Sequence, residues 1–173
     1  DFKAFYPTDV METAGEIIFF WVARMVMLGL YVTGKLPFQT VYLHGLVLDA
    51  KGQKMSKSKG NVIDPMGLID QSGTDALRIA LVIGNTPGTS LALAPEKIRA
   101  YKNFANKIWN ISRYVMSQEN NGGELKKELI EEFDTLAKDI TADMENYRFY
   151  LAAEKIYHYV WHRFADQILE ESK

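Results

Sequence analysis

Lysine and serine side chains that could bind phosphate are concentrated between Lys54 and Lys59, where six consecutive residues include three lysines and two serines. Gly52 precedes this stretch and Gly60 follows it, and glycine adopts backbone angles that other residues avoid. Ammonium groups meet phosphate oxygens as point charges, and a basic loop can wrap a polyphosphate. The stretch therefore predicts a phosphate-binding loop, with a solvated basic hairpin loop as the alternative. It lacks the Gly-x-x-x-x-Gly-Lys-Ser/Thr spacing of a Walker loop.

The strands and helix predicted before the loop indicate its position in the fold. Residues 40–48 form a near-continuous apolar run that indicates a buried strand, and residues 9–13 form a second short extended segment. Between them, Thr13 and Glu16 have the spacing of a capping box that opens a helix, and Gly34 is a suitable C-terminal cap. Strand, helix and strand make a βαβ unit with parallel strands. The loop would then follow the carboxyl end of a strand, where α/β proteins bind ligands.

The helix of this unit is apolar nearly all round. The run from Ile17 to Thr33 is slightly short for a membrane span and has Arg24 in its middle. We therefore expect a helix buried against the sheet, and no membrane partner.

Turn and cap signals divide the residues after the loop. Asp64 as N-cap with Pro65 at the first helical position predicts one short helix, and Thr74 is expected to cap a second. The stretch 84–93, which contains Pro87 and Gly88, is the strongest domain boundary signal in the chain.

The two sides of this boundary differ in pattern. Residues 1–86 are predicted to be a partial doubly wound, Rossmann-like α/β segment. Residues 87–173 contain three stretches with apolar spacings of three and four, which predict an α-helical bundle with breaks at 120–123 and at Asn146-Tyr147. The fold class is therefore an α/β segment followed by a helical bundle, and predominantly α overall.

Charge is distributed unevenly along the chain. Residues 1–116 carry 13 Lys and Arg against 9 Asp and Glu, whereas residues 117–173 carry 7 against 13. Contact with nucleic acid is therefore expected in the first two-thirds. The first bundle helix, from Pro95 to about Gln118, carries five candidate phosphate contacts: Lys97, Arg99, Lys102, Lys107 and Arg113. An ordinary solvated face is the alternative, and Trp109 and Trp161 are expected in the core.

Other chemistries have little support in the composition. The chain has no cysteine, which excludes disulfides, thiolate zinc sites and a cysteine nucleophile and suits a reducing cytosol. The three histidines show no metal-ligand spacing, so no metal site is predicted.

The string Lys-Met-Ser-Lys-Ser at residues 54–58 resembles the second signature motif of class I aminoacyl-tRNA synthetases. Further blocks at 17–25, 44–45, 54–61 and 103–110 are similar to the branched-aliphatic group, and to valyl-tRNA synthetases in particular. The resemblance implies the end of a catalytic domain with the KMSKS loop, followed by an anticodon-binding domain. It implies valine and ATP as substrates, tRNA(Val) as partner, Mg²⁺ with the triphosphate, a monomer and a cytoplasmic location.

The resemblance also assigns roles to residues. Lys54 and Lys57 would be catalytic, holding the β- and γ-phosphates of ATP. The full set of implied ATP contacts is Lys54, Ser56, Lys57, Ser58, His44, Gly45 and Glu16. For His44 the alternative is an imidazole satisfied within the sheet.

Two positions near the start of the first predicted helix depart from the family pattern. Glu16 stands where many relatives have an Asp that holds the ribose, and Ala14 stands where many have Gly. Glu16 is therefore either a ribose ligand or only a capping-box residue. Trp21 matches the wall of the amino-acid pocket, with a core aromatic as the alternative.

The first signature of the class, His-x-Gly-His, is absent from these residues. The chain alone is therefore expected not to activate an amino acid. Two other functions remain open: a segment of an isoleucyl or other aliphatic class I enzyme, or a non-catalytic RNA-binding module derived from one. For such a module, the loop lysines would be dispensable.

Overall fold

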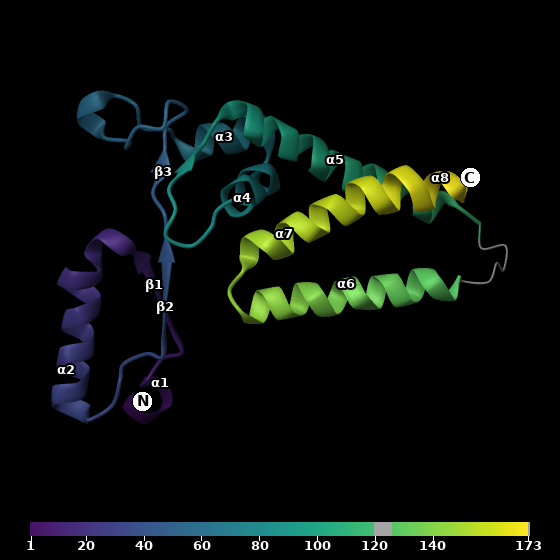
Figure 1. Cartoon of the computed structure of the whole chain (residues 1–173). Helices are drawn as coiled ribbons and strands as arrows, with labels where there is room; N and C mark the ends of the chain where they lie inside the picture. The colour runs from purple at the N-terminus through teal and green to yellow at the C-terminus, as the bar shows by residue number, and fades with distance from the viewer. Residues whose placement is uncertain (120–125, 173) are drawn as a thin grey trace.

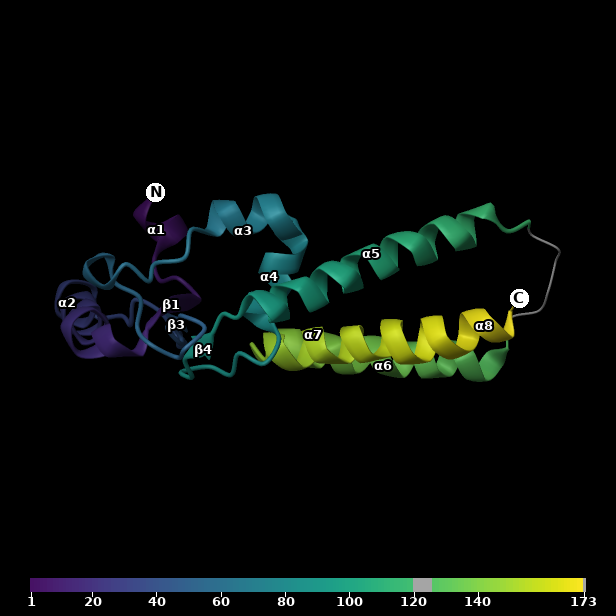
Figure 2. The ribbon, with the colours of Figure 1, turned by 90° about the horizontal axis from the view of Figure 1, so that it is seen from above.

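The computed structural model describes residues 1–119 and 126–172. Short helices and strands gather at one end of an elongated molecule, and long helices extend to the other end (Figure 1, Figure 2). The predicted break at residues 120–123 lies outside the described residues. The elements are, in chain order, α1 (Phe2–Phe5), β1 (Val10–Ala14), η1 (Gly15–Ile17), η2 (Ile18–Val22), α2 (Ala23–Thr33), β2 (Thr40–His44), β3 (Val47–Leu48), η3 (Lys57–Lys59), α3 (Pro65–Ser72), α4 (Thr74–Val82), β4 (Leu91–Ala92), α5 (Pro95–Ser117), α6 (Lys127–Glu145), α7 (Phe149–His158), η4 (Tyr159–Ile168) and α8 (Leu169–Glu171).

The first parallel pair confirms the predicted βαβ unit. β1 pairs with β2 in a register that joins Val10 to Thr40 and Ala14 to His44. The crossover ends at Gly34, whose φ of 69° is left-handed, as expected of a C-terminal cap. Both strands therefore end at the same edge of the pair.

The expected capping box at the start of the crossover is wrong. Thr13 lies within β1, pairs with Leu43 and is buried, so it does not cap a helix. The chain instead turns through η1 and η2 before α2 begins, and no side-chain cap precedes η1. Pairing with a strand 30 residues away has overridden a local signal, because tertiary contacts outweigh weak local preferences.

The expectation of a buried crossover helix is also wrong. Val22 is the one buried side chain from η2 through α2, whereas Phe19 is 78% exposed and Tyr31 is 89% exposed. A two-stranded sheet is too narrow to cover a helix that is apolar all round. By length and composition alone, the helical stretch from Gly15 to Thr33 could cross a membrane, and it is the one such stretch in the described residues.

The predicted strand over residues 40–48 is divided into two. It is interrupted at Gly45 and Leu46, and β3 then forms a second parallel pair with β4. The backbone of residues 88–93 follows β2 and β3, with Gly88 donating to the Leu43 carbonyl and Leu93 to the Leu48 carbonyl. The Gly- and Pro-containing stretch before α5 is therefore held against the strand that leads into the loop.

The two short helices after the loop are as predicted in position. Asp64 caps α3 by accepting hydrogen bonds from the backbone of Met66 and Gly67. The expected cap of α4 is wrong: Gly73 occupies the N-cap position, with φ of 89°, and Thr74 is the first helical residue.

The main core cluster joins α4 to α5. It consists of the buried residues Ala76, Leu77, Ala80, Leu93 and Ile98. This cluster continues across the stretch 84–93, so α5 begins packed on the preceding helices. The domain division at residues 86 and 87 stays a prediction.

The three long helices of the second half begin and end close to the predicted positions. α6 and α7 run antiparallel side by side, and α5 extends alongside the helix that continues from α7 (Figure 1, Figure 2). At the turn, Tyr147 has a φ of 58° and buried Asp143 accepts bonds from Arg148 at 2.8 Å and Lys155 at 2.7 Å. The Lys155 and Arg148 donors hold the pKa of the Asp143 carboxyl below its usual range.

Candidate functional site

The basic loop follows the second parallel pair, β3 with β4. β3 leads into it, and an antiparallel bridge between Leu48 and Lys54 closes its first turn. The single turn η3 follows, and Gly60, with φ of 65°, ends it in the left-handed conformation. In both ribbon views, the loop lies far from the outer ends of α6 and α8 (Figure 1, Figure 2).

Asp49 orders the first half of the loop. Its Oδ1 accepts hydrogen bonds from the backbone N–H of Lys51 at 2.9 Å and of Gln53 at 2.8 Å. Its Oδ2 accepts from Asn61 Nδ2 at 2.8 Å, across the base of the loop. The bond from Asn61, with the backbone donors, holds the pKa of the Asp49 carboxyl below its usual range. Asp49 is thus an ionised acceptor for three donors.

Asn61 extends this hydrogen-bond network to the lysine-containing segment. Its Oδ1 accepts from the Ser56 backbone N–H at 2.9 Å, and its Nδ2 also donates to the Lys54 carbonyl at 3.3 Å. Sequence reasoning did not single out Asp49 or Asn61. The available signal was their type, since Asp and Asn at both ends of a loop commonly bond to backbone groups.

The charged ends of the loop lysines remain in solvent. Lys54, Lys57 and Lys59 are exposed, and the hydroxyls of Ser56 and Ser58 lie 3.2 Å apart. The loop therefore presents cations and hydroxyls on an ordered backbone, which is the arrangement that polyphosphate binding needs.

Glu16 meets this loop from the end of β1. Its Oε2 lies 3.4 Å from Lys54 Nζ, and both side chains are more than half exposed. An exposed pair of this kind stabilises a structure little. The contact does show that the side chains of Glu16 and Lys54, 38 residues apart in the sequence, lie next to each other in the fold.

His44 and Gly45 lie at the carboxyl end of β2. His44 is largely exposed, with Nε2 3.6 Å from Glu12 and Nδ1 3.0 Å from the carbonyl of Gly45. A Cβ atom at Gly45 would overlap the backbone carbonyl of Thr89. The close approach of two backbones is therefore an immediate reason for glycine here.

Trp21 lies apart from the loop contacts described above. It is on η2, is 53% exposed, and has the Arg24 guanidinium 5.9 Å from its ring centre. The alternative prediction, that Trp21 is a core aromatic, is therefore wrong. Its role as a wall of the amino-acid pocket stays a prediction.

The five cations of α5 do not form one face. Lys97 donates to the Ile83 carbonyl, and its partial burial lowers the pKa of its ammonium. Lys107 bonds Asp166 at 2.7 Å and lies 4.5 Å from the centre of the Trp161 ring. The helical repeat places the other three within about 60° of one another. These three are Arg99, Lys102 and Arg113, of which Lys102 also donates from its ammonium to the Gln71 carbonyl at 2.8 Å.

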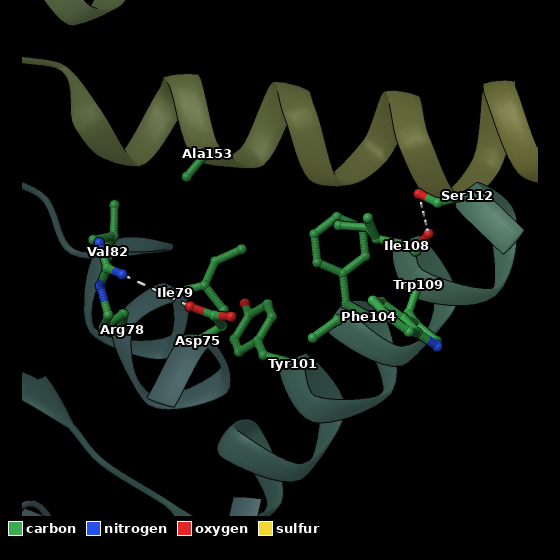
Figure 3. Close-up of a pocket in the computed structure, with 11 residues that line it drawn as sticks. Asp75, Arg78, Ile79, Val82, Tyr101, Phe104, Ile108, Trp109, Ser112 and Ala153 are labelled. Carbon is green, nitrogen blue, oxygen red and sulfur yellow. Dashed lines mark hydrogen bonds and ion pairs between the residues drawn. The ribbon is translucent and has the colours of Figure 1, made fainter. Parts of the chain in front are cut away.

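The two tryptophans of the bundle differ in exposure. Trp161 is half-buried and stacks on Phe104 and Tyr157, in line with the expected core position. Trp109 is 67% exposed, which overturns the same expectation for it. It borders an open groove of about 580 Å³ between α4, α5 and α7, and its indole nitrogen points away from Ala153 (Figure 3). By helical position it shares the side of α5 that carries Lys102.

No group of three or more histidine, aspartate or glutamate side chains in residues 1–119 and 126–172 could hold a metal ion. The exposed cations of the loop can bind a polyanion and stabilise its charge, and α5 carries further exposed cations.

Comparison with known proteins identifies the family. Residues 1–93 match the family model of tRNA synthetases class I (I, L, M and V). The chain belongs to the class I tRNA synthetases. Residues 126–173 of this synthetase chain also match the anticodon-binding domain of tRNA ligase.

Curated relatives of this class I chain are valine–tRNA ligases. That of Dehalococcoides mccartyi is 46% identical over all of this chain and 21% of its own length, and that of Clostridium acetobutylicum is 44% identical over 98% of this chain and 20% of its own. The chain thus spans about a fifth of the length of these relatives.

Solved structures of class I synthetases share the fold. Methionyl-tRNA synthetase of Mycobacterium tuberculosis bound by methionyl-adenylate is 27% identical, with a TM-score of 0.75 over 90% of this chain and 33% of its own. LeuRS of Agrobacterium radiobacter in a ternary complex with tRNA and LeuAMS gives a TM-score of 0.76 at 22% identity, over 87% of this chain and 22% of its own.

Proposed function

We propose that this chain is the KMSKS-loop and anticodon-binding segment of a valine–tRNA ligase, which activates valine with ATP and transfers it to tRNA(Val). The observation that carries the proposal is the ordered loop with three exposed lysines at the ends of parallel strands. The identity of 46% and 44% to valine–tRNA ligases supports valine as the amino acid. A cytoplasmic location follows from this role.

The loop acts on the triphosphate. When the valine carboxylate attacks the α-phosphate, negative charge grows on the departing pyrophosphate, so cations placed there lower the barrier. Lys54 and Lys57 supply these cations, and Lys54 exchanges its weak contact with Glu16 for phosphate oxygens. Ser56 and Ser58 donate from their hydroxyls. Mg²⁺ would arrive with ATP, because this ion usually binds through substrate phosphates and only one or two carboxylates.

Residues at and after the strand ends bind the nucleoside of ATP and the valine side chain. Glu16, which contacts the loop at Lys54, and His44, at the end of β2, meet the nucleoside, with Glu16 accepting from the ribose hydroxyls. Gly45 allows the close approach of the Thr89 backbone to the segment that leads into the loop. Trp21 borders the valine side chain.

The exposed side of α5 receives tRNA. Arg99 and Arg113 meet phosphates, and Trp109 offers a flat surface on which an unpaired base stacks. Lys97, Lys102 and Lys107 hold α5 to its neighbours instead. Their ammonium groups already bond the Ile83 carbonyl, the Gln71 carbonyl and the Asp166 carboxylate, respectively.

Amino-acid-dependent ATP–pyrophosphate exchange tests the proposal. The full-length protein is assayed with valine, isoleucine and threonine, beside a Lys57→Ala variant and a Lys138→Ala control on α6. We expect strong exchange with valine, a loss of about a hundredfold or more in Lys57→Ala, and no change in the control. Residues 1–173 alone are expected to show no exchange.

The other outcomes separate the alternatives. Exchange with isoleucine but not valine would keep the reaction and change the substrate. No exchange with any amino acid, together with tRNA binding, would leave a non-catalytic RNA-binding module.

A further inference from the structure

We propose that Asn61 is a positioning residue for the loop lysines and that it acts through Asp49. The inference rests on the proposed function, in which the loop binds the triphosphate of ATP. Neither side chain touches the substrate; each holds the backbone from which the lysines project.

The contacts converge on one point at the base of the loop. Asn61 accepts from Ser56 N–H at 2.9 Å and donates to Asp49 Oδ2 at 2.8 Å and the Lys54 carbonyl at 3.3 Å. One amide therefore ties the residues on both sides of Met55 to a carboxylate directly after β3. Both Asn61 and Asp49 are partly buried, while the lysine side chains are exposed.

The donors and acceptors of this pair are complementary in one arrangement. Asp49 Oδ1 is already engaged by two backbone N–H groups, so only Oδ2 faces Asn61. Turning the Asn61 amide over would set its oxygen against this carboxylate and its NH₂ against the Ser56 N–H. The partners therefore fix one orientation of the Asn61 amide, and in that orientation it holds the loop backbone at Lys54 and Ser56.

The positions of the loop lysines depend on the backbone of the loop, because their side chains are exposed and make few contacts of their own. Lys54 has an exposed pair with Glu16 at 3.4 Å, and η3, which carries Lys57, is one short turn. Cations that stabilise the negative charge developing in the transition state must already be in position before the reaction. Loosening the base of the loop should therefore lower kcat for adenylate formation more than it raises KM for ATP.

An exchange of the two side-chain types tests the pair in the full-length protein. Asn61→Asp sets two carboxylates against each other, and Asp49→Asn sets two amide NH₂ groups against each other. The double variant Asp49→Asn/Asn61→Asp restores one donor facing one acceptor between the two side chains, and its Asp side chain still accepts from Ser56 N–H. The bond to the Lys54 carbonyl is not restored, because a carboxylate cannot donate to it. Asn146→Asp, at the C-terminal end of α6, makes the same chemical change outside the loop.

We expect each single variant to lower kcat of valine-dependent exchange by about tenfold or more, with KM for ATP changing less than about threefold. The double variant should recover part of the lost rate and be faster than either single variant, and Asn146→Asp should match the unsubstituted protein. Transfer to tRNA from supplied valyl-adenylate, which has no pyrophosphate to bind, should be unchanged in all variants. That measurement also shows that the variants are folded.

Three results would overturn the inference. They are full exchange in both single variants, additive losses in the double variant, or an equal loss in the transfer step. Absence of exchange in the unsubstituted protein would instead overturn the proposed function and, with it, this inference.

Discussion

Gly45 lies against the backbone of Thr89, and a Cβ atom at Gly45 would occupy the space of the Thr89 carbonyl. This contact brings the segment before α5 onto the strand that leads into the KMSKS loop. The hydrogen bond from Gly88 to Leu43 lies beside it and continues the same pairing. The strands before the loop and the segment that leads into α5 are thus joined by backbone contact as well as by side-chain packing.

Replacing Gly45 with alanine is expected to destabilise this junction. The added methyl group must displace residues 89–90, and overpacking of this kind costs about 1–3 kcal/mol. Thermal unfolding and proteolysis of the 84–93 segment would measure the effect. Gly67→Ala is the matched control, because its Cβ would meet only Asp64 Oδ2 at an ordinary 3.7 Å. Equal stability of the two variants would contradict the close approach.

Asp143 is expected to make the α6–α7 turn sensitive to acid. Its hydrogen bonds to Lys155 and Arg148 lower the pKa of its carboxyl in the folded state, so it stabilises the fold at pH values above its unfolded pKa of about 3.9. That contribution is lost as the pH falls through the lowered folded pKa. Asp143→Asn should therefore reduce the melting temperature at pH 7, and the difference from the unsubstituted protein should shrink below about pH 4.

The melting temperature measured from pH 7 down to pH 2.5 checks this expectation. Asp139→Asn, an exposed change on the same helix, is the control and should follow the unsubstituted protein. A difference for Asp143→Asn that stays constant into acid would contradict the assigned ion pairs.

The exposed side of α5 is expected to bind tRNA by two separable means. Arg113→Ala should weaken binding and lower the slope of log K against log salt by about one, because one phosphate contact is lost. Trp109→Ala should weaken binding by about 1–3 kcal/mol with no change in that slope, since stacking releases no counterions.

Equilibrium binding of tRNA across a range of salt concentrations measures both quantities. Lys138→Ala, an exposed cation on α6, is the control and should bind as the unsubstituted protein does. Equal slopes for Arg113→Ala and the control would place the phosphate contacts elsewhere.

Local chemistry was enough to predict several features of this chain. Caps and periodicity depend on residues a few positions apart, so Asp64 was identified as a cap and α5 was placed from Pro95 to its observed end near Gln118. The KMSKS string and its flanking glycines predicted the loop and the family for the same reason, since a contiguous motif carries its own spacing.

Features that depend on distant partners were decided by the tertiary structure. Thr13 became part of a strand because Leu43 was available to pair with it. Lys107 turned toward Asp166, 59 residues further on, while Trp109 on the same helix stayed exposed. The bond between Asn61 and Asp49 is of the same kind. The residue types alone do not predict which atoms will bond. Only the folded path of the loop brings Asn61 Nδ2 within 2.8 Å of Asp49 Oδ2.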